Sequence, residues 1–370
     1  MIKVRTVKNK KELKAFIMFP YKANKGNPKF VPPLIKEEMK LFDSKLNPSY
    51  HHSDVSLWIA YKNKEVVGRV AGIINYKTVN KMKKKCAHFG WFDVINDSSV
   101  ATKLLETLEE WAKNRKVYTI IGPLGFTNLD NMGITVNGFN QINTLFSTSN
   151  KAYYKEFIES NGYEKKLEWH EYETKHVETV PYKLKKVSRR AKKYYQLRVI
   201  RPNSKNDIRI YLDELLRLLN HELNRIFDGV DLNKKQMNFY KKRLLRLINP
   251  KFVRIILDDK NHVIGFGMAI PSYRTALQKA HGRWYLSFLY KLKDLYVNKK
   301  FDTFLLAITD EYVGKGISAI IYEEFTNLIR HKQIELSYTY LEMENQPVPI
   351  YKNFPRKQLK KVRIYQKQIN

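Results

Sequence analysis

Cysteine is almost absent from this sequence. Cys86 is the single cysteine in 370 residues, so the chain cannot form an internal disulfide. Disulfides persist in oxidising compartments, and their absence fits a reducing one. We therefore expect the protein to be cytoplasmic.

Long apolar runs are also lacking. No run approaches the roughly 20 residues that a membrane-spanning helix needs. Residues 1–8, MIKVRTVK, lack the apolar core of a secretory signal peptide. These absences predict a protein that is soluble or bound peripherally at the inner face of a membrane.

Acidic residues are scarce relative to basic ones. The chain has 68 Lys and Arg against 36 Asp and Glu, a formal net charge of +32. Such an excess favours anionic partners, among them nucleic acid, anionic lipid, an acyl carrier protein and the phosphates of CoA. A surface of solvated lysines would give the same composition. The basic residues are spread along the chain and form no single block, so we do not expect nucleic acid as the partner.

The length and composition predict two folded domains. A chain of 370 residues with 43% hydrophobic residues can bury two ordinary cores. A basic stretch over 180–195 separates two regions that are richer in apolar residues. We place the N-terminal domain at 1–175, a basic linker at 176–195 and the C-terminal domain at 196–370.

Periodicity predicts a mixed α/β fold. The expected strands are 1–7, 57–60, 66–74, 86–95, 117–121, 169–173, 197–201, 252–257, 263–270, 304–308, 335–341 and 360–365. The expected helices are 9–23, 97–114, 150–161, 207–227, 233–247 and one that begins at about 317. Residues 62–65 and 258–261 predict hairpin turns, whereas 122–150 has no clear period and predicts a long functional or mobile loop.

The order of these elements repeats along the chain. The same spacing separates Gly68 from Gly265 and Tyr154 from Tyr351. Agreement near both ends of each half favours two copies of one mixed α/β fold, each with a central sheet.

A glycine loop in the second half is the most informative motif. The apolar run 304–308 is followed by Gly314-Lys315-Gly316, and a helical pattern begins at Ile317. A glycine turn before a helix presents backbone N–H groups and the positive end of the helix dipole, which together bind anions such as a pyrophosphate. An ordinary turn at a helix start has the same composition. Residues 96–99, at the matching place in the first half, contain no glycine pair, so we expect one cofactor site, in the C-terminal half.

This order of motifs resembles the acyl-CoA-binding half of the GNAT N-acyltransferase superfamily. A strand ending in 341–345 follows the loop, and 150–154 with 159–163 resembles the closing motif of the superfamily. Gln or Arg usually precedes the glycines there, whereas Glu311 and Tyr312 stand here. The resemblance covers nearly the whole chain as a tandem GNAT protein, similar to uncharacterised bacterial acyltransferases with Phe-Gly-[Trp/Phe]-Phe and Leu-Glu-x-x-Asn. It implies two domains, each with a mixed central sheet flanked by helices.

The resemblance also implies an activity and its residues. It implies direct transfer from acetyl-CoA or another acyl-CoA to an amine, in a cleft of the C-terminal domain and without a metal. The implied cofactor-binding residues are Ala307, Ile308 and Thr309 beside the thioester, Tyr312, Val313, Gly314, Lys315, Gly316, Ile317 and Ser318 at the pyrophosphate, and Asn345 at the pantetheine arm. The implied catalytic residues are Glu342 or Glu344 as the base for the amine and Tyr351 as the acid for the thiolate. Structural interpretations remain for each: a solvated pair, a turn cap for Asn345 and a core tyrosine for Tyr351.

An insert before the glycine-loop strand bears on the acceptor. Residues 273–300 combine aromatic residues and leucines, such as Trp284 and Phe288, with basic residues such as Arg283. This mixture suits a peripheral membrane surface or a lid over an acyl chain, although a helix packed on its own domain has a similar pattern. We expect the acceptor to be a small-molecule or lipid amine. The alternative function is a non-catalytic tandem GNAT-fold module that binds acyl-CoA, lipid or another acidic partner.

Overall fold

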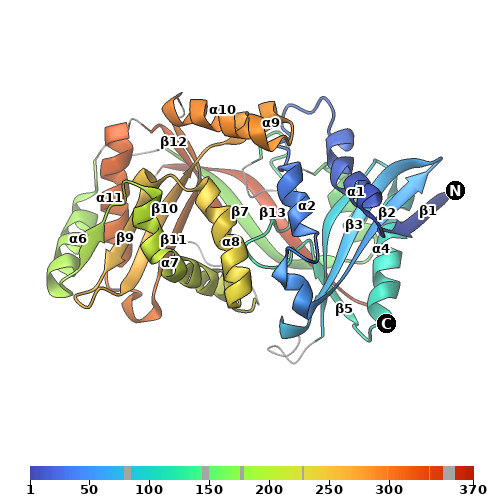
Figure 1. Cartoon of the computed structure of the whole chain (residues 1–370), viewed down its shortest axis with the longest axis horizontal. Coiled ribbons are helices and arrows are strands. Elements are labelled where there is room, and N and C mark those ends of the chain that lie inside the picture. The colour runs from blue at the N-terminus through green and yellow to red at the C-terminus, as the bar shows by residue number, and fades with distance from the viewer. Residues whose placement is uncertain are drawn as a thin grey trace.

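A computed structural model describes residues 1–78, 85–143, 150–175, 179–226, 229–297, 299–332, 334–344 and 355–370. Within these residues the chain forms one mixed sheet of thirteen strands with helices on both faces (Figure 1). The predicted mixed α/β fold is confirmed.

The N-terminal half begins with a strand meander. Its strands are β1 (Ile2–Thr6), β2 (Ser53–Lys62), β3 (Glu65–Asn75), β4 (Ala87–Val94), β5 (Thr119–Gly122) and β6 (Ile134–Asn137). Its helices are α1 (Lys10–Ala23), α2 (Ile35–Leu41), α4 (Ser98–Lys113) and α5 (Tyr153–Ser160), with a short 3-10 helix η1 (Pro48–His52). The predicted hairpin turn between β2 and β3 is confirmed, because Asn63 and Lys64 both have positive φ, 52° and 67°.

The C-terminal half repeats this arrangement. Its strands are β8 (Arg198–Ile200), β9 (Val253–Leu257), β10 (Val263–Pro271), β11 (Lys300–Ile308) and β12 (Leu336–Met343). Its helices are α6 (Tyr182–Tyr194), α7 (Lys205–Ile226), α8 (Lys234–Leu247), α9 (Arg274–Ala280), α10 (Trp284–Val297) and α11 (Ile317–Lys332), with 3-10 helices η2 (Pro250–Phe252) and η3 (Asp310–Tyr312). Helix α6 lies in the predicted linker and packs against α11 through Ser188 and Lys192, which both bond to Glu323.

Alternating side chains of each strand face different helices, as the two-residue period of a strand requires. In β2, Leu57 and Ile59 pack with α1 and α2, whereas Trp58 packs with α4. In β9, Val253 packs with α7 and α8, whereas Ile256 packs with α11. Each half is therefore a layer of strands between two layers of helices.

The two halves exchange strands where they meet. The order of strands is β1-β2-β3-β4-β5-β13-β7-β12-β11-β10-β9-β8, with β6 also paired to β13. Strand β7 (Glu164–Lys175) comes from the first half and lies beside β12, whereas β13 (Arg356–Gln368) comes from the second half and lies between β5 and β7. Both chain ends accordingly lie on the N-terminal side of the molecule (Figure 1). The two sets of strands thus join into one sheet, and the division at 176–195 stays a prediction.

Each half contains one parallel pair of strands that separates soon after it forms. Strand β4 pairs with β5 only at Ala87 and His88, and β11 pairs with β12 only at Lys300 and Phe301. In the first half the Leu124 N–H still donates to the Phe89 carbonyl at 2.7 Å, and the strands of each pair diverge beyond these contacts. A gap between sheet strands is where a ligand can approach unpaired backbone groups, so these two places position the candidate sites.

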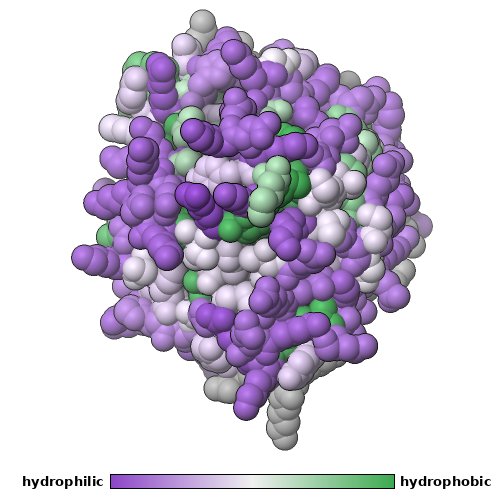
Figure 2. All heavy atoms as spheres, turned by 90° about the vertical axis from the view of Figure 1, so that its right-hand side faces the viewer, coloured by the Kyte–Doolittle hydropathy of each residue, from purple (hydrophilic) through white to green (hydrophobic). Residues whose placement is uncertain are grey.

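The surface follows from the composition. The face on the N-terminal side is mostly hydrophilic, with small apolar areas near its centre (Figure 2). No helix in the described parts of the chain has the length and apolar character needed to cross a membrane.

Candidate functional site

The glycine loop has the geometry that its sequence predicts. Strand β11 ends at Ile308, η3 follows, and α11 begins at Ile317 directly after Gly316. Gly314 and Gly316 have φ of +77° and +85°, a region where an L side chain is strained. Gly314 and Lys315 are exposed, so the N–H groups of the first turn of α11 face a reachable surface.

An open groove lies beside this loop. It has a volume of about 710 Å³ and is formed by the loop and α6, and its basic residues are Arg190, Lys193 and Lys315. The Lys315 ammonium lies 5.5 Å from the ring centre of Tyr195 and 5.2 Å from that of Tyr312. A Cβ on Gly316 would come within 3.0 Å of Val187, so glycine is required for α6 to pack here. The cationic groove and the helix start together favour a phosphate-bearing ligand.

The residues expected beside the thioester lie on β11 and after it. Ala307 is buried and pairs with Phe266, and Ile308 pairs with Gly265. The Thr309 N–H donates to the Ile264 carbonyl at 2.9 Å. The structure thus brings these residues to the base of the glycine loop, and their role toward a thioester stays a prediction.

Both candidate carboxylates at the end of β12 form ion pairs. Glu342 is buried and accepts from Arg356 Nη1 at 2.5 Å. Glu344 is exposed and lies 2.5 Å from Lys165 Nζ. Asn345 and Tyr351 lie outside the described residues. If Glu342 or Glu344 accepts a proton, it must therefore do so while it is paired with a cation.

Glu344 also belongs to a cluster with Glu168 and His170. The ligand atoms of these three side chains lie within 4.8 Å of one another. Arg363 Nη2 and Lys361 Nζ lie 2.7 and 3.4 Å from Glu168 oxygens. These cations balance the carboxylate charge, so the cluster does not indicate a metal site.

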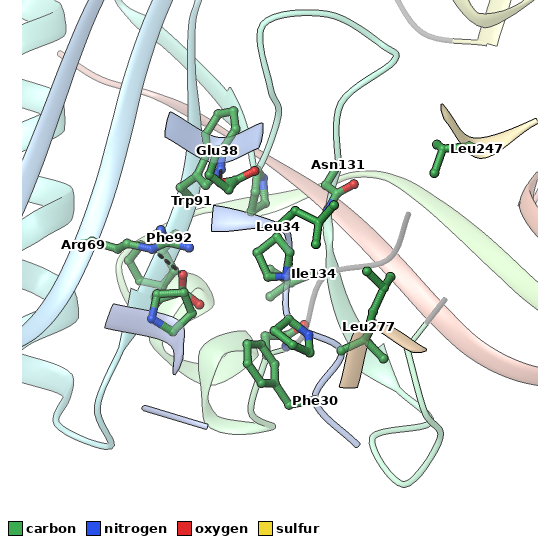
Figure 3. Close-up of a pocket in the computed structure, with 18 residues that line it drawn as sticks. Phe30, Leu34, Glu38, Arg69, Trp91, Phe92, Asn131, Ile134, Leu247 and Leu277 are labelled. Atoms are coloured by element: carbon green, nitrogen blue, oxygen red, sulfur yellow. Dashed lines mark hydrogen bonds and ion pairs between the residues drawn. The ribbon is translucent and has the colours of Figure 1, made fainter. Parts of the chain in front are cut away.

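The N-terminal half contains a pocket of about 170 Å³ where β4 and β5 diverge (Figure 3). Most of its lining is apolar: Pro20, Phe30, Val31, Pro32, Pro33, Leu34, Trp91, Phe92, Pro123, Gly133, Ile134, Leu247 and Leu277. The polar lining residues are Glu38, Arg69, Asp93, Asn131 and Asn150. Leu247 and Leu277 come from α8 and α9, so both halves contribute to this pocket.

The chain conformation at Trp91 shapes the polar end of the pocket. Trp91 has a φ of +46°, and the β3–β4 register shifts at this place. Such a bulge re-aims a side chain next to a site. The Trp91 indole N–H donates to Glu38 Oε2 at 2.9 Å. Burial raises the pKa of the Glu38 carboxyl above its ordinary value, and Arg69 opposes this shift.

A buried ion pair lies beside Glu38. Arg69 Nε donates to Asp93 Oδ2 at 2.7 Å, and Arg69 Nη1 donates to the Phe16 carbonyl at 2.9 Å (Figure 3 shows the ion pair). The Tyr154 hydroxyl accepts from the Val94 N–H at 3.0 Å, and burial raises the pKa of Tyr154 well above its usual range. The charges of the Arg69 guanidinium and the Asp93 carboxylate thus neutralise each other.

The start of α4 differs from the start of α11. Asp97 accepts from the Ser99 N–H at 3.1 Å and lies 2.8 Å from Lys62 Nζ. Lys62 lowers the pKa of Asp97, which keeps this carboxyl ionised. A carboxylate at a helix start occupies the site where a phosphate would bind and repels it. The N-terminal half therefore has a pocket but no phosphate cradle at the matching helix.

Sequence reasoning did not find the pocket residues. Periodicity predicts neither a helix nor a strand in 27–33, and it does not predict α2, which carries Glu38, because this helix is only one to two turns long. The motif Phe89–Phe92 indicates a family resemblance but not a pocket. The run of prolines followed by Glu37 and Glu38 was the signal that could have drawn attention to this segment.

Comparisons with known proteins agree with this architecture. Residues 27–132 match the acetyltransferase (GNAT) family, and these residues lie in the half without the glycine loop. The chain is 32% identical over 165 residues to "Protein YghO" of Escherichia coli K12, covering 45% of this chain and 42% of that protein. It is 26% identical over 181 residues to "Bacterial ceramide synthase" of Caulobacter vibrioides, covering 49% of this chain and 47% of that protein. The chain thus spans less than half the length of these curated relatives.

Solved structures show the same fold over the whole chain. A tandem GNAT protein from the clavulanic acid biosynthesis pathway aligns with 100% of this chain and 98% of its own, with a TM-score of 0.54 and 11% identity. Identity this low shows the fold alone. The strand order, the diverging pairs β4–β5 and β11–β12, and this alignment all indicate two copies of one fold.

Proposed function

Because the chain has the tandem GNAT fold, we propose that it is an N-acyltransferase that moves an acyl group from acyl-CoA to an amine. The observation that carries this proposal is the glycine loop at the start of α11, beside the basic groove and the diverging strands β11 and β12. The "ceramide synthase" name of one relative supports N-acylation as the reaction class.

The described residues fit an acyl-CoA at the C-terminal half. Within 312–318, the N–H groups of Tyr312, Val313 and Lys315 donate to carbonyls of the loop itself. The N–H groups of 314 and 316–318 would therefore hold the pyrophosphate, with Lys315 and Arg190 adding charge. Ala307, Ile308 and Thr309 would lie beside the thioester. A bound acyl-CoA supplies the activated carbonyl, and the protein orients it and excludes water.

The remaining roles follow the same proposal. Glu342 or Glu344 accepts the proton of the amine, directly or through water, and Tyr351 protonates the thiolate. Asn345 holds the pantetheine arm. A second candidate function is a non-catalytic module that binds acyl-CoA, lipid or another acidic partner. The ion pairs of Glu342 with Arg356 and Glu344 with Lys165 favour it, because they reduce the availability of both carboxylates.

The test of the cofactor site is a substitution in the glycine loop. Gly316→Glu should weaken CoA binding at least tenfold in calorimetry, because it adds a Cβ and a negative charge at the cradle. Gly316→Gln is the matched control, with the same bulk against α6 and no charge. Thermal unfolding shows whether each variant is folded. Unchanged affinity in a folded Gly316→Glu protein would remove the loop from the proposal.

A thiol-release assay separates the enzyme from the binding module. The protein is incubated with acetyl-CoA or long-chain acyl-CoA and a panel of small-molecule and lipid amines. Release of CoA thiol that depends on the amine is expected for the transferase. Binding of acyl-CoA without any amine-dependent release favours the non-catalytic module.

We also propose that the protein binds membranes peripherally through α10. Exposed apolar residues gather on this helix: Trp284, Tyr285, Phe288 and Leu289 are each 49–60% exposed. The adjacent Lys36 ammonium lies 4.7 Å from the Trp284 ring centre. Aromatic residues and leucine insert into the interface, while each nearby Lys or Arg adds about 1 kcal/mol at an anionic surface.

Vesicle sedimentation tests this contact. Wild type should bind anionic vesicles more than neutral ones, and binding should weaken without vanishing at 1 M salt, where the Debye length is about 3 Å. The triple variant Trp284→Ser/Phe288→Ser/Leu289→Ser should lose the salt-resistant part. The control removes three exposed apolar side chains elsewhere, Tyr118→Ser/Tyr182→Ser/Ile210→Ser. Equal losses in both variants, or no loss in either, would contradict a contact through α10.

A further inference from the structure

We propose that the pocket between α2 and the diverging strands β4 and β5 binds a single-chain amphiphile, with its amine against Glu38 and its hydrocarbon chain along the apolar wall (Figure 3). As a binding site it is independent of the glycine loop. As the acceptor site it rests on the proposed N-acyltransferase function.

The wall of the pocket fits a hydrocarbon chain. The segment before α2 contributes Phe30, Val31 and Leu34, and Ile134 and Leu277 lie across from it (Figure 3). These side chains come from three separate places in the chain, including α9 of the other half. Each methylene that moves from water into such a wall contributes about 0.8 kcal/mol. A purely polar ligand would leave this wall uncovered.

The polar end fits an amine and not an anion. Arg69 already binds Asp93 and the Phe16 carbonyl, so its guanidinium is committed. The Glu38 carboxyl accepts from the Trp91 N–H. The charges of Arg69 and Arg243 act on it, but these guanidinium groups form their ion pairs with Asp93 and Asp130. Because Asp93 is paired with Arg69, the Glu38 carboxyl is the acidic group that remains for a ligand. A carboxylate or phosphate brought here would meet that acid.

The charge state of Glu38 is compatible with either protonation state of an amine. Burial raises its pKa, and Arg69, Arg243 and the Trp91 N–H oppose the shift, while Asp130 adds to it. A carboxylate bonds an ammonium, and a protonated carboxyl donates to a neutral amine, so one proton is shared in both cases. In both arrangements the nitrogen lone pair is engaged with the shared proton, so acyl transfer requires that proton to stay on Glu38 and its hydrogen bond to the nitrogen to break.

The start of α4 disfavours a pyrophosphate in this half. At the start of α4, Asp97 and its partner Lys62 occupy the place that the glycine loop has at α11. The pocket is therefore suited to a ligand without a pyrophosphate, while the C-terminal loop is suited to one with it. Two halves of one fold would in this way take different ligands.

The pocket also lies next to the proposed membrane contact. The Ile35 N–H donates to the Gly282 carbonyl at 3.0 Å, which ties the start of α2 to the turn before α10. A Cβ on Gly282 would come within 2.5 Å of the Tyr21 hydroxyl, so this turn packs tightly against α1. Helix α2 thus carries Lys36 over Trp284 on one side and Glu38 in the pocket on the other. An amphiphile at the membrane surface would have a short path to this site.

The first experiment compares three ligands of equal chain length by calorimetry, below their micelle concentrations. Decylamine should bind with one site per chain. Decanol should bind at least tenfold more weakly because it lacks the amine, and decanoate more weakly still. Equal affinity for all three, or a preference for decanoate, would overturn the assignment of the polar end.

The second experiment changes the site. Glu38→Gln keeps the shape and an acceptor for Trp91, and it should lower decylamine affinity at least tenfold. Glu37→Gln is the matched control on the same helix, since Glu37 bonds Lys40 and Arg246 outside the pocket, and it should leave affinity unchanged. Leu277→Trp should fill the pocket and abolish decylamine binding. Retained binding in Glu38→Gln or in Leu277→Trp would overturn the proposal.

The third experiment separates this inference from the proposed function. CoA titration of Leu277→Trp should give wild-type affinity, because the glycine loop is a separate site, and it also reports that the variant is folded. Decylamine binding without any amine-dependent thiol release would sustain the site and remove the acyltransferase proposal. Thiol release with an intact rate in Leu277→Trp would sustain the acyltransferase and overturn this pocket as its acceptor site.

Discussion

Replacing Ile364 by alanine tests whether β13 packs into the N-terminal half. Ile364 is fully buried, pairs with Leu167 of β7, and belongs to a cluster with Cys86, Ile121 and Trp169. Truncating a buried isoleucine to alanine costs about 2–5 kcal/mol. A loss of about 3 kcal/mol raises the population of the open cluster by a factor of about 100.

The single cysteine makes this opening measurable. Cys86 is 4% exposed and packs in the same cluster, so its reaction with an excess of a thiol reagent under native conditions reports local opening. Ile364→Ala should speed this reaction by one to two orders of magnitude. Ile329→Ala, in the core beneath α11, is the control that loses a similar side chain from the other half. An unchanged Cys86 rate in a destabilised Ile364→Ala protein, or an equal increase in both variants, would refute the proposed local packing.

Three further predictions follow from single residues. Burial lowers the pKa of His88 to about 4 from an unfolded value of 6.5, so the unfolded chain binds its proton first as the pH falls. The free energy of unfolding should therefore fall by at most about 3 kcal/mol from pH 6.5 to 4. In His88→Gln this free energy, measured by denaturant unfolding, should change less over the same pH range, and an unchanged pH dependence would contradict this. Asp93→Asn leaves the buried Arg69 without its ion pair and should cost about 3–5 kcal/mol in denaturant unfolding, whereas a loss under 1 kcal/mol would show that the pair is solvated. Gly314→Ala has open space for its Cβ but a φ of +77°, so it should cost only about 1–2 kcal/mol by the same measurement. A larger loss would contradict the open space around this Cβ.

Local features of the fold could be predicted from the sequence. The alternation in 57–74 and 252–270 gave both hairpins, and the structure places β2–β3 and β9–β10 there. The apolar face of α4, with Leu104, Leu108 and Trp111, is buried as its spacing indicates. The left-handed conformations of Gly314 and Gly316 agree with the reading of a glycine turn before a helix. These signals lie within a few residues of one another, so a sequence window contains them.

Features built from distant segments could not be predicted in this way. The position of β13 depends on pairing with β5 and β7, and no pattern inside 356–368 names those partners. The N-terminal pocket combines α2, a bulge at Trp91 and α9, which a periodicity analysis treats separately. The place of Glu342 and Glu344 at the end of a strand can be predicted from the sequence. Their pairing with Arg356 and Lys165 depends on segments that are distant in the chain.

The exchange of strands has a consequence for how the chain is made. Strand β13 is synthesised after every other strand of the sheet, yet its place lies between β5 and β7 of the first half. At about 5–20 residues per second, roughly 10 to 40 s pass between the synthesis of β7 and that of β13. During this time the nascent first half presents two unpaired strand edges, which are templates for pairing with another chain. The edges of β5 and β7 thus stay exposed until β13 has been synthesised. A ribosome-associated chaperone would have its largest effect on the yield of folded protein during this time.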